Sequence, residues 1–144
     1  AELARFEPSR DFPMSIIVAD LDNMKTTNDK RGHAIGDELL KSVASVLRGT
    51  FRAEDILARI GGDEFAILLP GTDSATTVQM LSRVQAKLAE HNVKYPDLPI
   101  QLSLGSSTAE QGKLTEAFKL ADQCMYADKA VRKSSKEKSR FAGL

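Results

Sequence analysis

The chain has 144 residues, 42% of them hydrophobic, and its 20 lysines and arginines balance 20 aspartates and glutamates. This length suits one globular domain with a buried core, and the zero net charge excludes a chain-wide positive field for a nucleic acid polymer. The sequence has one cysteine, Cys124, and no apolar run of membrane-spanning length. An internal disulfide is therefore excluded, and we expect a cytoplasmic domain without membrane contact.

The first half of the chain contains four predicted elements. A β-branched run over residues 14–19 predicts a buried strand that ends at Asp20. Apolar residues at helical spacing predict a helix over residues 37–47. Two apolar runs, 56–58 and 65–69, flank a Gly-Gly turn and predict a β-hairpin.

The second half contains a helix, a strand and a last helix. The first of these helices is expected to begin with Thr72 or Asp73 as its N-cap. Its expected apolar face consists of Val78, Leu81, Val84 and Leu88. Alternating apolar residues over 100–104 predict a strand with one buried face, and residues 114–125 a final helix. We interpret Cys124 in that helix as a buried core thiol.

The order of the elements predicts an α+β fold. A hairpin inside an alternating series of helices and strands implies a mixed central sheet covered by helices. We divide the chain into a lead-in over residues 1–13, one domain over 14–131 and a tail over 132–144. The polar, basic composition of the tail favours a flexible end.

The hairpin turn, Gly61-Gly62-Asp63-Glu64, is the most informative stretch. Glycines allow turn conformations closed to other residues and let a ligand approach the backbone closely. Carboxylates at the tip of such a hairpin suit a metal ion that carries phosphates. An ordinary hairpin with a charged turn is the alternative on local grounds.

A carboxylate also stands where the first strand ends. If the hairpin lies beside that strand, Asp20 converges with Asp63 and Glu64, and such carboxylates repel each other unless a cation lies between them. Because the donors are oxygens and no Cys/His cluster exists, the pattern favours Mg²⁺ or Mn²⁺ over zinc. Asp22 is left out of the metal site, because the strand pleat is expected to turn it away.

The polar segment 23–37 leads into a helix N-terminus, which suits an anion or a nucleotide. Asp37 can accept hydrogen bonds from both N1–H and the N2 amino group of guanine, and Asn28 can pair with the remaining edge atoms. Lys25 can neutralise phosphate charge during a reaction. His33 is interpreted first as structural and second as a ligand contact. The local alternatives are a helix N-cap for Asp37 and a turn residue for Asn28.

Three blocks of sequence, in this order, resemble the diguanylate cyclase (GGDEF) family. They are Asp20-Leu-Asp-Asn-Met-Lys25-x-x-Asn28-Asp-x-x-Gly32-His33-x-x-Gly36-Asp37-x-x-Leu40, then Gly61-Gly62-Asp63-Glu64-Phe65, then Ala121-Asp122-x-x-Met125-Tyr126-x-x-Lys129. The similarity covers about residues 14–129. The resemblance implies a fold akin to nucleotidyl cyclases and polymerase palms, with the signature in the hairpin.

The resemblance also implies an activity, in which two GTP molecules condense to cyclic di-GMP and release two pyrophosphates. Each domain would bind one GTP, so activity would require a homodimer with two domains face to face. A covalently linked sensor domain is expected in the full-length protein. The alternative is a catalytically weak module that binds GTP or cyclic di-GMP and regulates a partner.

Site roles carry over from the family residue by residue. The implied metal ligands are Asp20, the carbonyl of Leu21, Asp63 and Glu64. The residues implied to bind GTP are Lys25, Asn28, His33, Asp37, Gly61, Gly62, Lys129 and Lys133. Asp63 is expected to assist deprotonation of the attacking 3′-hydroxyl, with Glu64 and Lys25 as the other catalytic residues.

The run from Arg52 to Asp55 resembles the family's RxxD site for inhibition by cyclic di-GMP. Arg52 can fork onto a phosphate or stack on guanine, and Asp55 can accept from a guanine edge. Arg83 is expected to add a second guanidinium. An ion pair at the surface is the alternative for Arg52 and Asp55.

The chain departs from the family pattern at several positions. Met24 replaces the usual Phe, and Arg31 replaces a usual aromatic residue. Asp128 stands where Ala is usual, and Arg132-Lys133 replaces the usual Gly-Arg. We therefore expect changed phosphate contacts at the C-terminal end of the site.

Overall fold

The computed structural model describes residues 12–142, with side chains described over 12–135. Its strands are β1 (Met14–Leu21), β2 (Ile56–Arg59), β3 (Glu64–Leu69) and β4 (Leu102–Ala109). Its helices are α1 (Met24–Arg31), α2 (His33–Thr50), α3 (Ser74–Lys94) and α4 (Leu114–Ala142). Within the described residues, no helix combines the length and the apolar character needed to cross a membrane. The lead-in predicted over residues 1–13 lies almost wholly outside the described residues.

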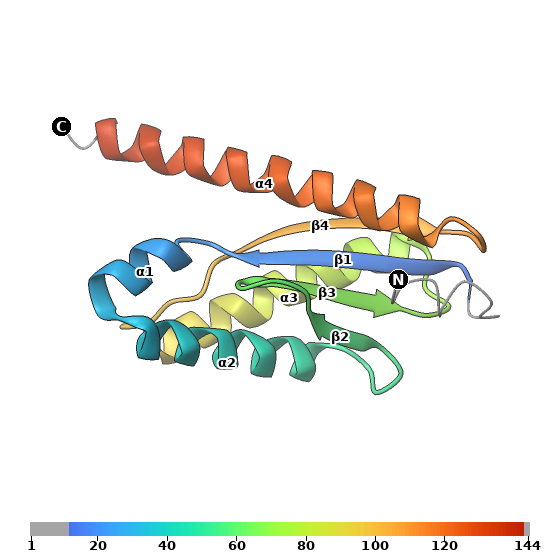
Figure 1. The fold of residues 1–144 in the computed structure, drawn as a ribbon, viewed down its shortest axis with the longest axis horizontal. Helices are drawn as coiled ribbons and strands as arrows, with labels where there is room; N and C mark the ends of the chain where they lie inside the picture. Colours follow the sequence, from blue (N-terminus) through green and yellow to red (C-terminus); the bar gives the residue numbers. More distant parts are fainter. Residues whose placement is uncertain (1–11, 143–144) are drawn as a thin grey trace.

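The strands of the described chain form one sheet in the order β2-β3-β1-β4, with α4 on one face and α2 and α3 on the other (Figure 1). The predicted α+β class is confirmed, but the predicted mixed sheet is not, because every described pairing is antiparallel. The crossover through α3 does join two parallel strands, β3 and β4. Because β1 lies between those strands, they never pair with each other.

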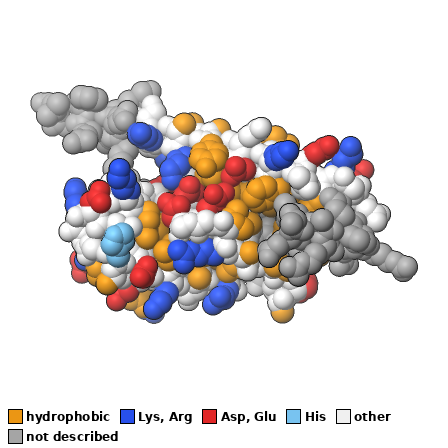
Figure 2. Space-filling model, in the orientation of Figure 1, with side chains coloured by type: hydrophobic (Ala, Val, Ile, Leu, Met, Phe, Trp, Pro, Cys, Tyr) orange, Lys and Arg blue, Asp and Glu red, His pale blue; other side chains and the backbone are white. Residues whose placement is uncertain are grey.

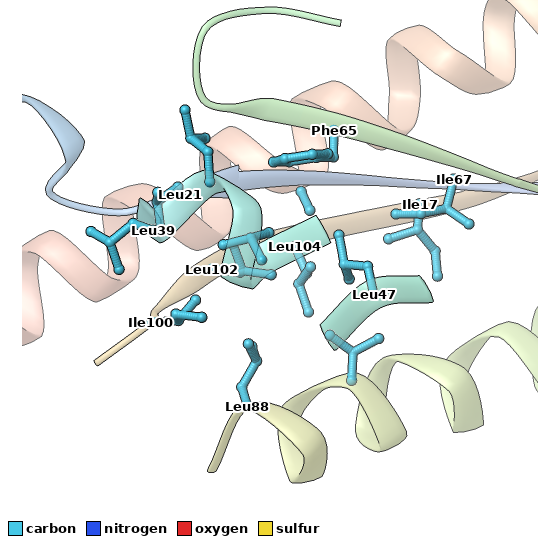
Figure 3. Close-up of a cluster of buried hydrophobic side chains, with 14 of the residues drawn as sticks. Ile17, Leu21, Leu39, Leu47, Phe65, Ile67, Leu88, Ile100, Leu102 and Leu104 are labelled. Atoms are coloured by element: carbon cyan, nitrogen blue, oxygen red, sulfur yellow. The ribbon is translucent and has the colours of Figure 1, made fainter. Parts of the chain in front are cut away.

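Both faces of β1 are buried, and its residues alternate between two cores. Ile17, Ala19 and Leu21 face the larger cluster against α2 and α3, part of which Figure 3 shows. Ile16 and Val18 face the smaller cluster beneath α4. Asp20 continues this second set along the pleat and therefore lies on the α4 face. The alternation thus brings a carboxylate under α4 at the end of the strand.

Close packing of α4 on β4 depends on one glycine. Gly105 pairs with Val18 and so lies on the α4 face of the sheet. A Cβ at this position would lie 2.2 Å from the backbone oxygen of Ala121 and 2.2 Å from the backbone nitrogen of Met125. Backbone atoms cannot rotate away as a flexible side chain can. Only glycine therefore permits the observed distance between the helix and the sheet.

Several predicted elements have different boundaries or contents in the structure. Helix α1 was not predicted, because none of its residues is buried and no apolar periodicity marks it. Val78 is 60% exposed although it was assigned to the apolar face of α3, and the neighbouring Thr77 is buried instead. Cys124 is exposed rather than buried, because Ala121 and Met125 occupy the face of α4 that meets the sheet.

The last helix is also longer than predicted. The apolar periodicity ended near residue 125, whereas α4 continues to Ala142 through most of the predicted tail. Its second half extends past the carboxyl end of β1 (Figure 1). Side chains on that half can therefore reach the region where β1 ends.

Replacing Gly105 with alanine is expected to lower the free energy of unfolding by about 1–3 kcal/mol, because α4 must move away from β4. Urea denaturation followed by circular dichroism measures this loss. Gly49→Ala is the matched control, since a Cβ there would meet nothing within 4 Å and alanine favours the helix. Equal stability of Gly105→Ala and the unchanged chain would contradict this packing argument.

Candidate functional site

The hairpin turn between β2 and β3 is held by the arginine that precedes it. The guanidinium of Arg59 donates hydrogen bonds to the carbonyl of Gly61 at 3.2 Å and to that of Gly62 at 2.7 and 3.1 Å. Neither Gly61 nor Gly62 has a positive φ, although a Gly-Gly turn allows one. A Cβ on Gly62 would meet nothing within 4 Å, whereas a Cβ on Gly61 would lie 3.6 Å from Cβ of Glu64, so the open space lies at Gly62. The structure therefore has open space at Gly62 and a positive φ at neither glycine.

The predicted convergence of carboxylates at one end of the sheet is confirmed. Asp20 and Glu64 are register partners in the β1–β3 pair. The backbone nitrogen of Leu21 donates to the carbonyl of Asp63 at 2.9 Å, which ties the turn to the end of β1. Acidic side chains gather near the middle of the face shown in Figure 2, with lysines and arginines nearby.

The environment of these carboxylates favours their neutral forms. Burial, together with a hydrogen bond and the negative charge of Asp122 on α4, raises the pKa of Glu64 to about 7. Burial and the charge of Asp63 raise the pKa of Asp20, although the Lys129 ammonium partly opposes this rise. A carboxylate cluster that is costly to ionise binds a cation favourably.

In this structure the cation beside the cluster is Lys129. Its Nζ lies 3.3 Å from Oδ2 of Asp20 and 3.7 Å from Oδ1 of Asp22. The hydroxyl of Ser103 and Oδ1 of Asp22 form a 2.6 Å hydrogen bond. The prediction that Asp22 turns away was wrong, because residues two apart on a strand share a face. Asp22 is thus part of the charged cluster.

The available donors fit a hard divalent ion. Oδ1 of Asp20 and Oδ2 of Asp22 are buried and have no hydrogen-bond partner among the described residues. These donors are carboxylate oxygens, which suit Mg²⁺ or Mn²⁺ better than zinc. No three His, Cys, Asp or Glu side chains in the described part of the chain are already grouped to hold a metal ion. In this structure the Lys129 ammonium provides positive charge beside these carboxylates.

A hollow of about 460 Å³ lies between the hairpin turn, α1 and the start of α2. Six residues predicted to belong to the site line it: Lys25, Asn28, His33, Asp37, Gly62 and Asp63. Met24, Asp29, Leu40 and Arg59 complete the lining. We call this space the first hollow. It brings the polar segment 23–37 and the signature turn together.

The positions of Asn28 and Asp37 exclude the simpler interpretations of both residues. Asn28 lies in α1 rather than in a turn, and Asp37 lies inside α2, which begins at His33, rather than at its N-cap. A Cβ on Gly36 would lie 2.0 Å from Oδ1 of Asn28, so this glycine makes room for the amide. That buried oxygen has no hydrogen-bond partner within the described chain. The turn interpretation of Asn28 and the N-cap interpretation of Asp37 are therefore both wrong.

A second hollow, of about 240 Å³, lies between the end of β1 and α4. Its lining consists of Asp22, Asn23, Gln101, Lys129, Arg132 and Lys133. Lys129 and Lys133 were both predicted to bind GTP. Lys25, the other lysine predicted to hold phosphates, lines the first hollow instead. The predicted phosphate-binding lysines thus lie in two separate places.

The run from Arg52 to Asp55, which resembles the family's inhibition site, contains the ion pair that the sequence analysis gave as the alternative. Nη2 of Arg52 lies 3.3 Å from Oδ1 of Asp55, and the backbone nitrogen of Arg52 donates to Oδ2 at 2.8 Å. The Asp55 side chain is only 2% exposed, whereas that of Arg52 is 55% exposed. Arg83 lies exposed on α3 and, among the described contacts, meets neither residue. Arg52 is therefore the accessible member of the pair.

Two charged residues near the site, Asp122 and Arg59, were missed, and a third, Asp22, was wrongly left out, although the sequence held a signal for each. Asp122 lies seven residues before Lys129, a spacing that returns to the same helix face. Asp22 lies two residues after Asp20 and so shares its face of the strand, and Arg59 lies two residues before the Gly-Gly turn that it holds. Periodicity could therefore have found Asp122 and Asp22.

The family model described as "Diguanylate cyclase, GGDEF domain" matches residues 1–135. The chain belongs to this family. Diguanylate cyclase DgcP of Pseudomonas aeruginosa PAO1 is 39% identical over 117 residues, which are 79% of this chain. The chain spans 17% of the length of that relative.

Solved structures of family members have the same fold. The active GGEEF domain of a diguanylate cyclase from Vibrio cholerae has a TM-score of 0.74 and 31% identity, and the match covers 86% of this chain and 80% of that one. The GGDEF domain of DgcB from Caulobacter crescentus, in complex with c-di-GMP, has a TM-score of 0.78 and 26% identity. That match covers 90% of this chain and 81% of the other.

The Lys129→Met substitution is expected to destabilise the protein by about 1–2 kcal/mol in a chelator-containing buffer, because it leaves Asp20 and Asp22 without a counter-charge. Urea denaturation at neutral pH measures the change. Lys113→Met is the matched control, since it removes an exposed pair with Glu116 at 3.8 Å, which contributes about 0–1 kcal/mol. Equal effects of the two substitutions would contradict a structural role for Lys129.

Proposed function

We propose that the chain is a diguanylate cyclase, which condenses two GTP molecules into cyclic di-GMP and two pyrophosphates. The observation that best supports this proposal is that the first hollow and the carboxylate cluster meet at Asp63. Asp63 lines the hollow that contains Asn28 and Asp37, and it lies close enough to Asp20 to raise the pKa of that carboxyl. Groups suited to a guanine base and groups suited to phosphate transfer therefore adjoin.

In this proposal the first hollow holds the guanine. The exposed carboxylate of Asp37 accepts from N1–H and from the N2 amino group, a pair of donors that adenine lacks. Asn28, whose amide oxygen lacks a partner in the described chain, pairs with the remaining edge atoms. His33 lines the same hollow and adds a contact.

A divalent ion, Mg²⁺ or Mn²⁺, would be held by Asp20 and Asp63, with Glu64 and the carbonyl of Leu21 as further donors. When bound, such an ion supplies positive charge that neutralises phosphate oxygens and lowers the pKa of a nearby hydroxyl. Unpartnered Oδ1 of Asp20 supports this assignment. Lys129, released from the two aspartates, then reaches the phosphates.

The remaining binding residues hold the polyphosphate. Lys25 reaches it from the first hollow, while Lys129 and Lys133 reach it from the second. Gly61 and Gly62 let it pass close to the turn, which is open at Gly62. Because the lysines approach from both sides, the α-phosphorus is kept beside the carboxylates.

The reaction is an in-line displacement at each α-phosphorus. The 3′-oxygen of one GTP bonds to the α-phosphorus of the other, the α–β phosphoanhydride bond breaks, and pyrophosphate leaves. Asp63 accepts the proton of the 3′-hydroxyl. Lys25 neutralises negative charge on the phosphate oxygens, and Glu64 acts as a further donor to the divalent ion. Each hydroxyl attacks the nucleotide of another domain, so two copies must face each other across a two-fold axis.

Cyclic di-GMP is proposed to inhibit through Arg52, Asp55 and Arg83. Because Asp55 is buried and paired with Arg52, we assign it to hold the guanidinium rather than to contact guanine first. Arg52 then meets the phosphate, and Arg83 approaches from α3. Control of dimerisation by a linked sensor domain is part of the same proposal.

Purified protein incubated with GTP and Mg²⁺ is expected to form cyclic di-GMP at a rate that rises faster than linearly with protein concentration. Asp63→Ala is expected to lower that rate at least about 100-fold, because the proton acceptor and a metal ligand are lost. Chromatography of the products measures both. Asp97→Ala, an exposed carboxylate outside both hollows, is the control and should leave the rate unchanged.

GTP binding without product would contradict the cyclase and support a regulatory module, provided that fusion to a dimeric coiled coil also fails to restore product. Product after fusion would show instead that two copies had not met. The fusion therefore separates the two explanations.

Asp37→Ser is expected to reduce the preference for GTP over ATP by roughly 10-fold to 100-fold, because the paired acceptor for guanine is lost. Competition binding of the two nucleotides measures this preference. Glu38→Ser, an exposed neighbour on α2 that does not line the first hollow, is the matched control. An unchanged preference in Asp37→Ser would remove Asp37 from the guanine site.

A further inference from the structure

We propose that Arg132 is a further phosphate-binding residue of this chain and that Asp128 positions it. The inference rests on the proposed function in one respect, since it takes the ligand to be the polyphosphate of GTP. It concerns the second hollow, at the C-terminal half of α4. Neither residue was predicted to contact substrate.

The second hollow gathers positive charge on one side. Lys129, Arg132 and Lys133 all line it, because positions three and four apart lie on the same helix face. The acidic member of the lining, Asp22, is already bound by Lys129 and Ser103. The described lining therefore has three cationic groups and one carboxylate, and its net positive charge suits a polyanion.

Asp128 is a fixed acceptor beside Arg132, which lines this hollow. Its Oδ2 accepts a 2.9 Å hydrogen bond from the backbone nitrogen of Leu104 on β4. In the described sheet β4 is an outer strand, so this N–H has no strand partner on that side. The same Oδ2 accepts from Nε of Arg132 at 3.2 Å. The sheet edge thus holds the carboxylate, and the carboxylate holds the guanidinium.

The pairing leaves the phosphate-binding part of Arg132 available. Nε carries one of the five guanidinium N–H groups, and the two terminal nitrogens carry the other four. Among the described residues these terminal nitrogens have no hydrogen-bond partner, and the side chain is 36% exposed. A planar pair of amino groups matches two oxygens of a phosphate. An arginine held by Nε is therefore ready to bind phosphate with its free edge.

The hollow also lies where a polyphosphate would arrive. Asp20 lies next to Asp63, and Asp63 lines the first hollow. Asp20 is also paired with Lys129, and Lys129 lines the second hollow. A nucleotide with its base in the first hollow would extend past Asp20 toward Arg132. We therefore assign Arg132 to the β- and γ-phosphates, and not to the base.

Calorimetric titration of the whole chain with GTP and excess Mg²⁺, with guanosine and with inorganic tripolyphosphate tests this assignment. Arg132→Ala is expected to weaken GTP and tripolyphosphate about fivefold to tenfold and to leave guanosine unchanged. Lys119→Ala is the matched control, because it removes an exposed charge from the same helix about 20 Å away. Unchanged GTP and tripolyphosphate affinity in Arg132→Ala, or an equal loss for guanosine, would overturn the proposal.

The positioning role of Asp128 is tested by a double-mutant cycle. Asp128→Asn keeps an oxygen for the Leu104 N–H but loses the charge that holds Arg132, so GTP affinity is expected to fall about threefold. In an Arg132→Ala background the same change is expected to have no further effect. An equal loss in both backgrounds would mean that Asp128 acts on the fold alone.

The three ligands separate this proposal from the cyclase itself. If the unchanged chain binds tripolyphosphate but does not prefer GTP over ATP, the proposed function fails, while Arg132→Ala still decides the phosphate contact. If the unchanged chain binds neither GTP nor tripolyphosphate, the phosphate site itself is wrong. Circular dichroism and the thermal midpoint of each variant show that a lost affinity does not come from unfolding.

Discussion

The register of β1 against β3 determines where the chemistry of this domain lies. It sets Asp20 opposite Glu64 on the face covered by α4, while the odd-numbered neighbours of Asp20 enter the core against α2 and α3. A shift of one residue would send Asp20 into that core and its apolar neighbours outward. The two buried faces of β1 make such a shift costly. Hydrophobic burial therefore fixes the position of the carboxylates without any ligand.

The same arrangement creates an electrostatic problem that α4 resolves. Carboxylates gathered at a partly buried sheet end raise one another's pKa and destabilise the fold unless a cation is near. Lys129 provides that charge, and it can do so because Gly105 lets α4 approach β4 closely. The close packing of α4 on β4 and the neutralisation of the carboxylates by Lys129 therefore depend on each other. A ligand that brings its own cation would take over the compensation from Lys129.

The glycines of the site serve different physical needs, which the sequence pattern does not distinguish. Gly36 makes room for Asn28, Gly62 leaves the hairpin tip open, and Gly105 admits a helix backbone. We expected the signature glycines to adopt unusual dihedral angles, and they do not. Only the three-dimensional surroundings show whether a missing Cβ relieves crowding or leaves space.

The sequence by itself determined the α+β class and the hairpin, because these follow from short-range patterns of polarity and turn residues. It predicted the convergence of Asp20 with Asp63 and Glu64 only on the condition that the hairpin lies beside β1, which the structure decided. It did not determine the neighbours of β1, the exposure of Cys124, or the pairing of Lys129 with Asp22. Those features depend on which elements pack together, and segments far apart in the chain decide that. Periodicity describes one element at a time, whereas strand order and helix docking are set by the total burial of all of them.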